Sequence, residues 1–137
     1  MEPSSTPAQI AVSAARAAPQ SRRKAMLAVL LLDAAVDEAF VRSGESDVLE
    51  FRARLATTHR ELGLVMEVAA MREGGPRLVL EPVEVAVADT PALGVEDYMV
   101  SLYNDRTVPR VLVAPADGGR RDVHALLAAA MDELLRL

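Results

Sequence analysis

Residues 21–44, SRRKAMLAVLLLDAAVDEAFVRSG, decide the fold because they predict a helix that is apolar around most of its circumference. The helix is expected from Ser21 to about Arg42 and to end at Ser43 and Gly44. Its recurring apolar positions are Leu27, Leu30, Leu31, Ala34 and Val41. A helix with so narrow a polar stripe must be covered on several sides, by its own sheet and a neighbouring helix or by a second subunit.

The next helix is expected to begin near Asp47, whose carboxylate can cap the first turn while Glu50 completes a capping-box arrangement. Its buried positions are predicted at Val48, Phe51, Leu55, Thr58 and Leu62. These positions are three or four residues apart, which is the clearest helical periodicity in the chain.

Where this second helix ends is open between two interpretations. Gly63 suits a left-handed C-cap, whereas Val65 and Ala69 prolong the same stripe to Gly74. We favour the break, which makes 64–72 a strand that turns at 73–76 and pairs with an antiparallel strand at 77–87. Pro82 lies inside that second strand and has no N–H donor, so it is expected at an edge or a bulge.

The remaining segments are 98–103, 108–114 and a terminal helix that starts at Asp122. The first two predict either a hairpin through Asn104 and Asp105 or a helix followed by a strand. The fold class that follows is α+β: an N-terminal helical hairpin and the C-terminal helix packed on a small, mainly antiparallel sheet. The alternative is α/β, with 83–87 and 108–114 as parallel strands joined by a helix through Met99.

The first 20 residues are rich in Ala, Ser and Pro and predict a flexible tail, followed by one globular domain over residues 21–137. A short helix from Pro7 to Ala18 with Thr6 as N-cap is the alternative. Arg22 and Arg23 before an apolar run resemble a twin-arginine export signal, but Asp33 interrupts that run after eight residues. We therefore interpret the segment as the first helix of the domain.

Composition excludes several classes of protein. With no cysteine among 137 residues, thiol catalysis, disulfides and Cys-ligated metals are ruled out, and a reducing cytoplasm is permitted. The net charge of -5 disfavours a nucleic-acid or anionic-membrane surface, and no stretch approaches the ~20 apolar residues that span a bilayer. Lys24 is the single lysine, and this skew towards arginine suggests a GC-rich bacterial genome.

Neither histidine predicts a metal site, since His59 and His124 have no carboxylate or second histidine one helical turn away. The carboxylates Asp33, Asp37 and Glu38 are either an acid–base group in a cleft or a solvated stripe, and the stripe is the simpler reading. No cofactor is expected.

The most specific local feature is the turn from Gly118 to Asp122, between an apolar strand and a helix start. Gly118 and Gly119 would allow close backbone approach, while Arg120 and Arg121 would bind a phosphate or carboxylate. Tyr98 and Tyr103 are the other tentative ligand-binding residues. A surface loop with Asp122 as N-cap explains the same residues and is the simpler interpretation.

Two functions are compatible with these observations. The first is a non-catalytic, cytoplasmic accessory protein, such as a chaperone or assembly factor, that binds a protein partner or client through apolar helix surfaces and forms homodimers. The second is a small regulator or enzyme that binds an anionic ligand at the 118–122 turn. We favour the first because no catalytic motif is present.

Overall fold

The computed structural model describes residues 6–84, 107–115 and 119–137, and these form five helices and a three-stranded antiparallel sheet. The fold class is therefore α+β, as predicted. In chain order the elements are α1 (Pro7–Ala17), α2 (Arg22–Ser43), α3 (Val48–Thr58), α4 (Arg60–Ala70), β1 (Arg77–Glu84), β2 (Thr107–Ala114), β3 (Arg121–Asp122) and α6 (Val123–Leu135). No helix in these ranges has the length and apolar character needed to cross a membrane.

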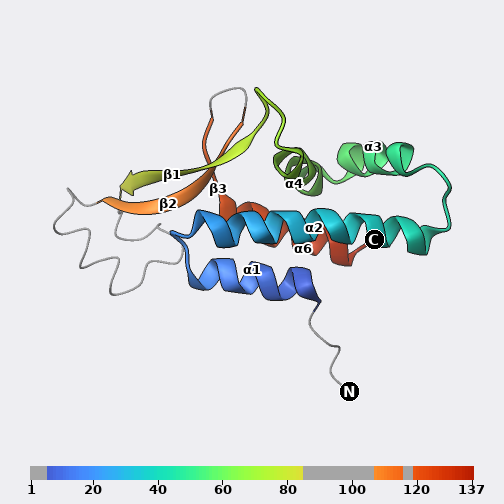
Figure 1. The fold of residues 1–137 in the computed structure, drawn as a ribbon, viewed down its shortest axis with the longest axis horizontal. Helices are drawn as coiled ribbons and strands as arrows, with labels where there is room; N and C mark the ends of the chain where they lie inside the picture. The colour runs from blue at the N-terminus through green and yellow to red at the C-terminus, as the bar shows by residue number, and fades with distance from the viewer. Residues whose placement is uncertain (1–5, 85–106, 116–118) are drawn as a thin grey trace, which may run out of the picture.

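Helix α2 is the centre of the helical layer and packs against α1, α3, α4 and α6, while the sheet lies at the end where α2 begins (Figure 1). Ser21 caps its start by accepting a hydrogen bond from the Lys24 N–H, and Gly44 ends it in the left-handed conformation at φ 75°. The prediction that this helix is covered on several sides is correct for the face that packs on these helices, but it is wrong for the apolar positions Leu27, Leu30, Ala34 and Val41, which are exposed. The helices pack mainly on one another, and their core is almost entirely aliphatic.

The N-terminal prediction is wrong for residues 7–17, which form α1 instead of a flexible tail. Thr6 accepts a hydrogen bond from the Gln9 N–H, and the Gln9 side chain accepts one from the Thr6 N–H, so the capping box is complete. Ala8, Ala11 and Ala15 are buried against neighbouring helices. Because these side chains are small, α1 can approach its neighbouring helices closely. Close packing therefore stabilises α1 although its apolar stripe is narrow.

The prediction of a strand at 64–72 is also wrong, because helix α4 occupies this segment. The break falls at His59, and the helical stripe continues beyond it through Leu62, Val65 and Val68, all buried. Packing against α2, α3 and α6 selects the helical alternative over the C-cap at Gly63. The predicted hairpin between 64–72 and 77–87 is therefore absent.

Strand β1 pairs instead with β2, from Arg77 opposite Ala114 to Glu84 opposite Thr107, and β2 pairs with β3. The pairing is antiparallel, so the α/β alternative with parallel strands is wrong. Pro82 lies on an edge strand of the described sheet, as predicted, and opposite Pro109. The described β3 pairs only with residues 112 and 113 of β2, so neither proline removes a bond to a third strand.

Candidate functional site

The candidate site is a cleft of about 760 Å³ where α2 begins, α4 ends and β1 begins. Three apolar side chains, Met26, Val68 and Leu78, line its interior, and Met71 stands beside them with 69% of its surface exposed. We call this the α2–β1 cleft. An apolar cleft open to solvent is typical of a binding site for an apolar group.

The turn between α4 and β1, which borders this cleft, depends on two residues in the left-handed conformation. Helix α4 ends at Met71, which adopts the left-handed conformation at φ 50°, unusual for a residue with a side chain. The chain then turns through Gly74, at φ 78°, where a side chain would be strained. Residues 73–76 line the cleft, and β1 begins directly after them.

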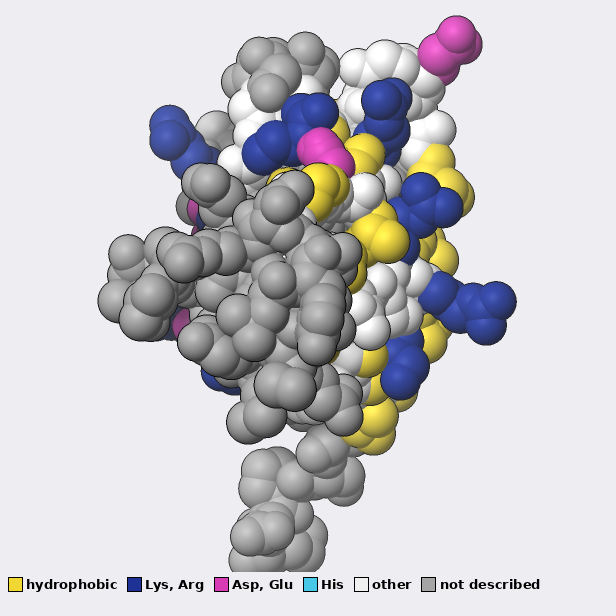
Figure 2. Space-filling model, turned by 90° about the vertical axis from the view of Figure 1, so that its left-hand side faces the viewer, with side chains coloured by type: hydrophobic (Ala, Val, Ile, Leu, Met, Phe, Trp, Pro, Cys, Tyr) yellow, Lys and Arg dark blue, Asp and Glu magenta, His cyan; other side chains and the backbone are white. Residues whose placement is uncertain are grey.

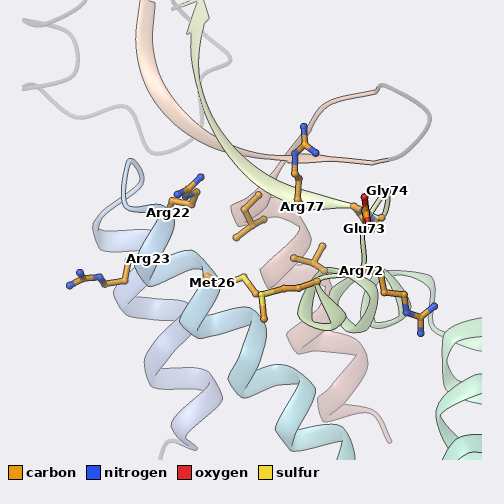
Figure 3. Close-up of a pocket in the computed structure, with 12 residues that line it drawn as sticks. Arg22, Arg23, Met26, Arg72, Glu73, Gly74 and Arg77 are labelled. Carbon is orange, nitrogen blue, oxygen red and sulfur yellow. The ribbon is translucent and has the colours of Figure 1, made fainter.

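The rim of the α2–β1 cleft is basic, with Arg22, Arg23, Arg72 and Arg77 against the single carboxylate of Glu73. Figure 3 shows Met26 in the middle of the cleft, with Arg23 and Arg72 directed away on opposite sides and Arg77 directed away from the helices. Within the described ranges none of these four arginines forms an ion pair. The rim is thus a positive patch on a chain whose net charge is -5.

The end of the molecule where α2 begins shows the same character in space-filling view. In its described part, Lys and Arg side chains stand among and around hydrophobic side chains, with little negative charge between them (Figure 2). Salt screens charges over about 8–10 Å at ordinary ionic strength, so such a patch attracts an acidic partner within about that distance.

In the turn at 118–122, which the sequence predicts to bind an anion, both arginines contact carboxylates of the protein itself. Nε of Arg120 donates to the Glu81 carboxylate at 2.7 and 3.1 Å, whereas Arg121 pairs with Glu61 of α4. Asp122 accepts the Ala125 N–H at 3.0 Å, so it is the N-cap of α6, as predicted. The two arginines therefore serve separate carboxylates on β1 and α4. Gly119 is described, while Gly118, Tyr98 and Tyr103 lie outside the described residues.

The carboxylate stripe of α2 is held by an arginine from α3. Arg52 donates from Nη1 to Asp33 Oδ1 at 2.9 Å and from Nη2 to Asp37 Oδ1 at 3.0 Å. Burial alone would lower the pKa of Arg52, but hydrogen bonds and attraction from the two aspartates outweigh it, so its pKa is raised. This network joins α2 to α3, and it favours the structural reading of the stripe over the acid–base reading.

The histidines are not arranged as ligands in the described ranges. Nδ1 of His59 lies 2.8 Å from the Thr58 hydroxyl, at the break between α3 and α4. Both ring nitrogens of His124 are shielded from solvent and have no hydrogen-bond partner. Within the same ranges, no three His, Cys, Asp or Glu side chains are grouped so that they could hold a metal ion.

Sequence reasoning missed the α2–β1 cleft because its two walls are about 50 residues apart in the chain. The available signal was the segment Arg72–Arg77, REGGPR, in which two arginines flank a Gly-Gly-Pro turn. Arg22 and Arg23, on the other wall, resemble part of an export signal when the sequence is read alone. Comparison with known protein families, with curated proteins and with solved structures finds no match to this chain.

Proposed function

We propose that the protein is a non-catalytic, cytoplasmic accessory protein that binds a partner through the α2–β1 cleft. The bound segment carries an apolar side chain between acidic residues: the apolar side chain enters beside Met26, and the carboxylates meet the arginine rim. The observation that supports this proposal is an apolar cleft surrounded by arginines that form no ion pair within the part of the chain that the structure describes.

Binding is favoured over chemistry by the side chains available. The described residues that line the cleft provide one carboxylate, from Glu73, and no hydroxyl, imidazole or thiol group. Acid–base or nucleophilic catalysis needs at least a positioned pair of such groups. Burying one Leu or Phe side chain contributes roughly 1.5–3 kcal/mol, so an apolar anchor adds to the affinity without any catalytic group.

An acidic protein segment fits better than a nucleic acid or a small anion. The described lining contains no aromatic ring on which a base could stack. A phosphate or a lone carboxylate is best held by donors that converge on one point, whereas the labelled arginines in Figure 3 point in different directions. Carboxylates spread along a peptide match this divergent arrangement.

Fluorescence polarisation with labelled peptides tests the proposal. The probe is an acidic peptide with a central Leu-Phe pair, compared with a peptide of Lys flanks and with one in which Leu-Phe is replaced by Gly-Ser. We expect saturable binding of the first peptide alone, weakened by salt. Saturable binding of the Lys-flanked peptide, or no binding of the acidic one, would contradict the proposal.

Charge reversal locates the binding at the cleft. The double variant Arg72→Glu, Arg77→Glu should weaken binding at least about tenfold, which is about 1.4 kcal/mol. Arg42 and Arg60 are exposed and form no ion pair within the described ranges, so Arg42→Glu, Arg60→Glu is the matched control with the same change in net charge. Equal losses in both double variants would show that only net charge matters.

A further inference from the structure

Helix α2 has a second apolar face, directed away from the core. Its core face consists of Ala25, Ala28, Val29, Leu32, Val36 and Ala39. On the opposite face Leu27 is 51% exposed, Leu30 41% and Val41 75%, and Ala34 between them is exposed as well. We call this the outer face of α2. Several large aliphatic side chains in one exposed line mark an interaction surface.

The outer face repeats with the spacing of a coiled coil. Positions 23, 27, 30, 34, 37 and 41 are separated alternately by four and three residues, which is the heptad spacing of core positions in a two-helix pair. Leu27, Leu30, Ala34 and Val41 occupy four of these positions, and the charged residues Arg23 and Asp37 occupy the other two. Asp37 is the carboxylate that Arg52 of α3 also binds. The apolar central part of the outer face, from Leu27 to Ala34, can therefore take another helix.

Charge along α2 identifies the partner helix. The helix begins with three consecutive cations at residues 22–24, and its second half carries Asp37 and Glu38. Lys24 and Glu38 lie on the same flank of the outer face and form no ion pair within the described ranges. A second α2 in the opposite direction brings Lys24 of each copy to Glu38 of the other, whereas a parallel copy sets like charges together.

We propose that two copies of this chain pair through the outer faces of α2, antiparallel and centred near Leu31. Leu27, Leu30 and Ala34 of both copies form the apolar centre, and a Lys24–Glu38 pair closes each end. This dimer does not rest on the proposed function, because none of the residues at its apolar centre, Leu27, Leu30 and Ala34, lines the α2–β1 cleft; Arg23 alone borders both surfaces.

Cross-linking tests the orientation, and the absence of cysteine makes single engineered thiols unambiguous. Residues 23 and 41 are 18 apart, or about 27 Å along a helix at 1.5 Å per residue. With a short bismaleimide, a mixture of Arg23→Cys and Val41→Cys proteins should give a cross-linked dimer, and neither protein alone should. Cross-linking of either protein alone would overturn the antiparallel arrangement.

Charge reversal tests the pairing, with sedimentation velocity as the readout at concentrations up to about 100 μM. Lys24→Glu and Glu38→Lys should each weaken dimerisation at least tenfold, and the double variant should restore it to within about threefold. Glu67→Lys, at an exposed position on α4, is the control that leaves dimerisation unchanged. A monomeric parent protein, or a double variant as weak as the single ones, would overturn the proposal.

Discussion

The backbone N–H of Leu62, in the first turn of α4, donates a 2.8 Å hydrogen bond to Oε1 of Glu133 in α6. His59 precedes α4 but provides no side-chain cap, so a carboxylate 71 residues further along the chain satisfies this donor. The negative charge also lies at the positive end of the helix dipole. Glu133 therefore joins the start of α4 to the last turns of the terminal helix.

Removal of the Glu133 carboxylate should lower the stability of the folded protein. We expect Glu133→Ala to lower the free energy of unfolding by about 1–2 kcal/mol, the usual cost of losing a helix cap. Glu133→Gln keeps an acceptor and should lose less. Asp132→Ala, at the exposed neighbouring position, is the control for urea unfolding. Equal effects at 132 and 133 would show that the cap contributes nothing.

Gly63 is required by the close approach of α4 to α3. A Cβ at this position would lie 3.0 Å from both Cα and O of Ala56, and these backbone atoms cannot move away independently. We expect Gly63→Ala to destabilise the protein by about 1–3 kcal/mol, although alanine alone favours a helix. Thermal unfolding should show a lower Tm for Gly63→Ala. Glu67→Ala, at an exposed position on the same helix, should change the Tm in the opposite direction.

Arg52 offsets the repulsion between two carboxylates that are four residues apart on α2. Its side chain is 24% exposed and that of Asp33 is 28% exposed, so solvent screens their interaction only in part. We expect Arg52→Gln to cost about 1–3 kcal/mol, between the values for exposed and buried ion pairs. The double variant Arg52→Gln, Asp33→Asn should recover much of this loss in urea unfolding. A simple sum of the two single effects would refute the coupling.

The pair between Glu45 and Arg54 should make stability depend on pH. The hydrogen bond from Arg54 lowers the pKa of Glu45 below its ordinary value of 4.5, so the folded protein keeps this carboxylate ionised where the unfolded chain takes up a proton. The stabilisation is present at neutral pH and is lost as the pH falls below 4.5. The difference in Tm between the parent protein and Glu45→Gln should shrink over that range. A Tm difference that stays constant with pH would contradict this role of the Glu45–Arg54 pair.

His124 is a polar side chain whose replacement should do no harm. Both of its ring nitrogens are shielded and have no hydrogen-bond partner among the described residues, which costs folding free energy. We expect His124→Leu to raise the free energy of unfolding by about 1 kcal/mol. His59→Leu is the contrast, since it removes the contact with the Thr58 hydroxyl and should give no gain. A destabilised His124→Leu protein would show that the imidazole has a role in folding.

Local sequence signals predicted the helices whose ends are marked by a capping side chain or a C-cap glycine. Ser21 and Gly44 bound α2, Asp47 caps α3 and Asp122 caps α6, each within a few residues of the backbone group it serves. The strand pattern of 108–114 was likewise sufficient. The candidate cleft could not be predicted in this way, because no local pattern brings residues 22–26 next to residues 68–78.

By itself, the sequence determined the α+β class, the aliphatic core, the helix caps and the apolar character of α2 all round, because these depend on residues a few positions apart. The tertiary structure alone decided that 60–70 is a helix, that α1 packs against the core, and that β1 pairs with β2. These outcomes depend on burial against distant elements, whose free energy exceeds the small local preferences of a Gly63 or an alanine-rich segment. For the same physical reason, one face of α2 became core and the other became the exposed outer face.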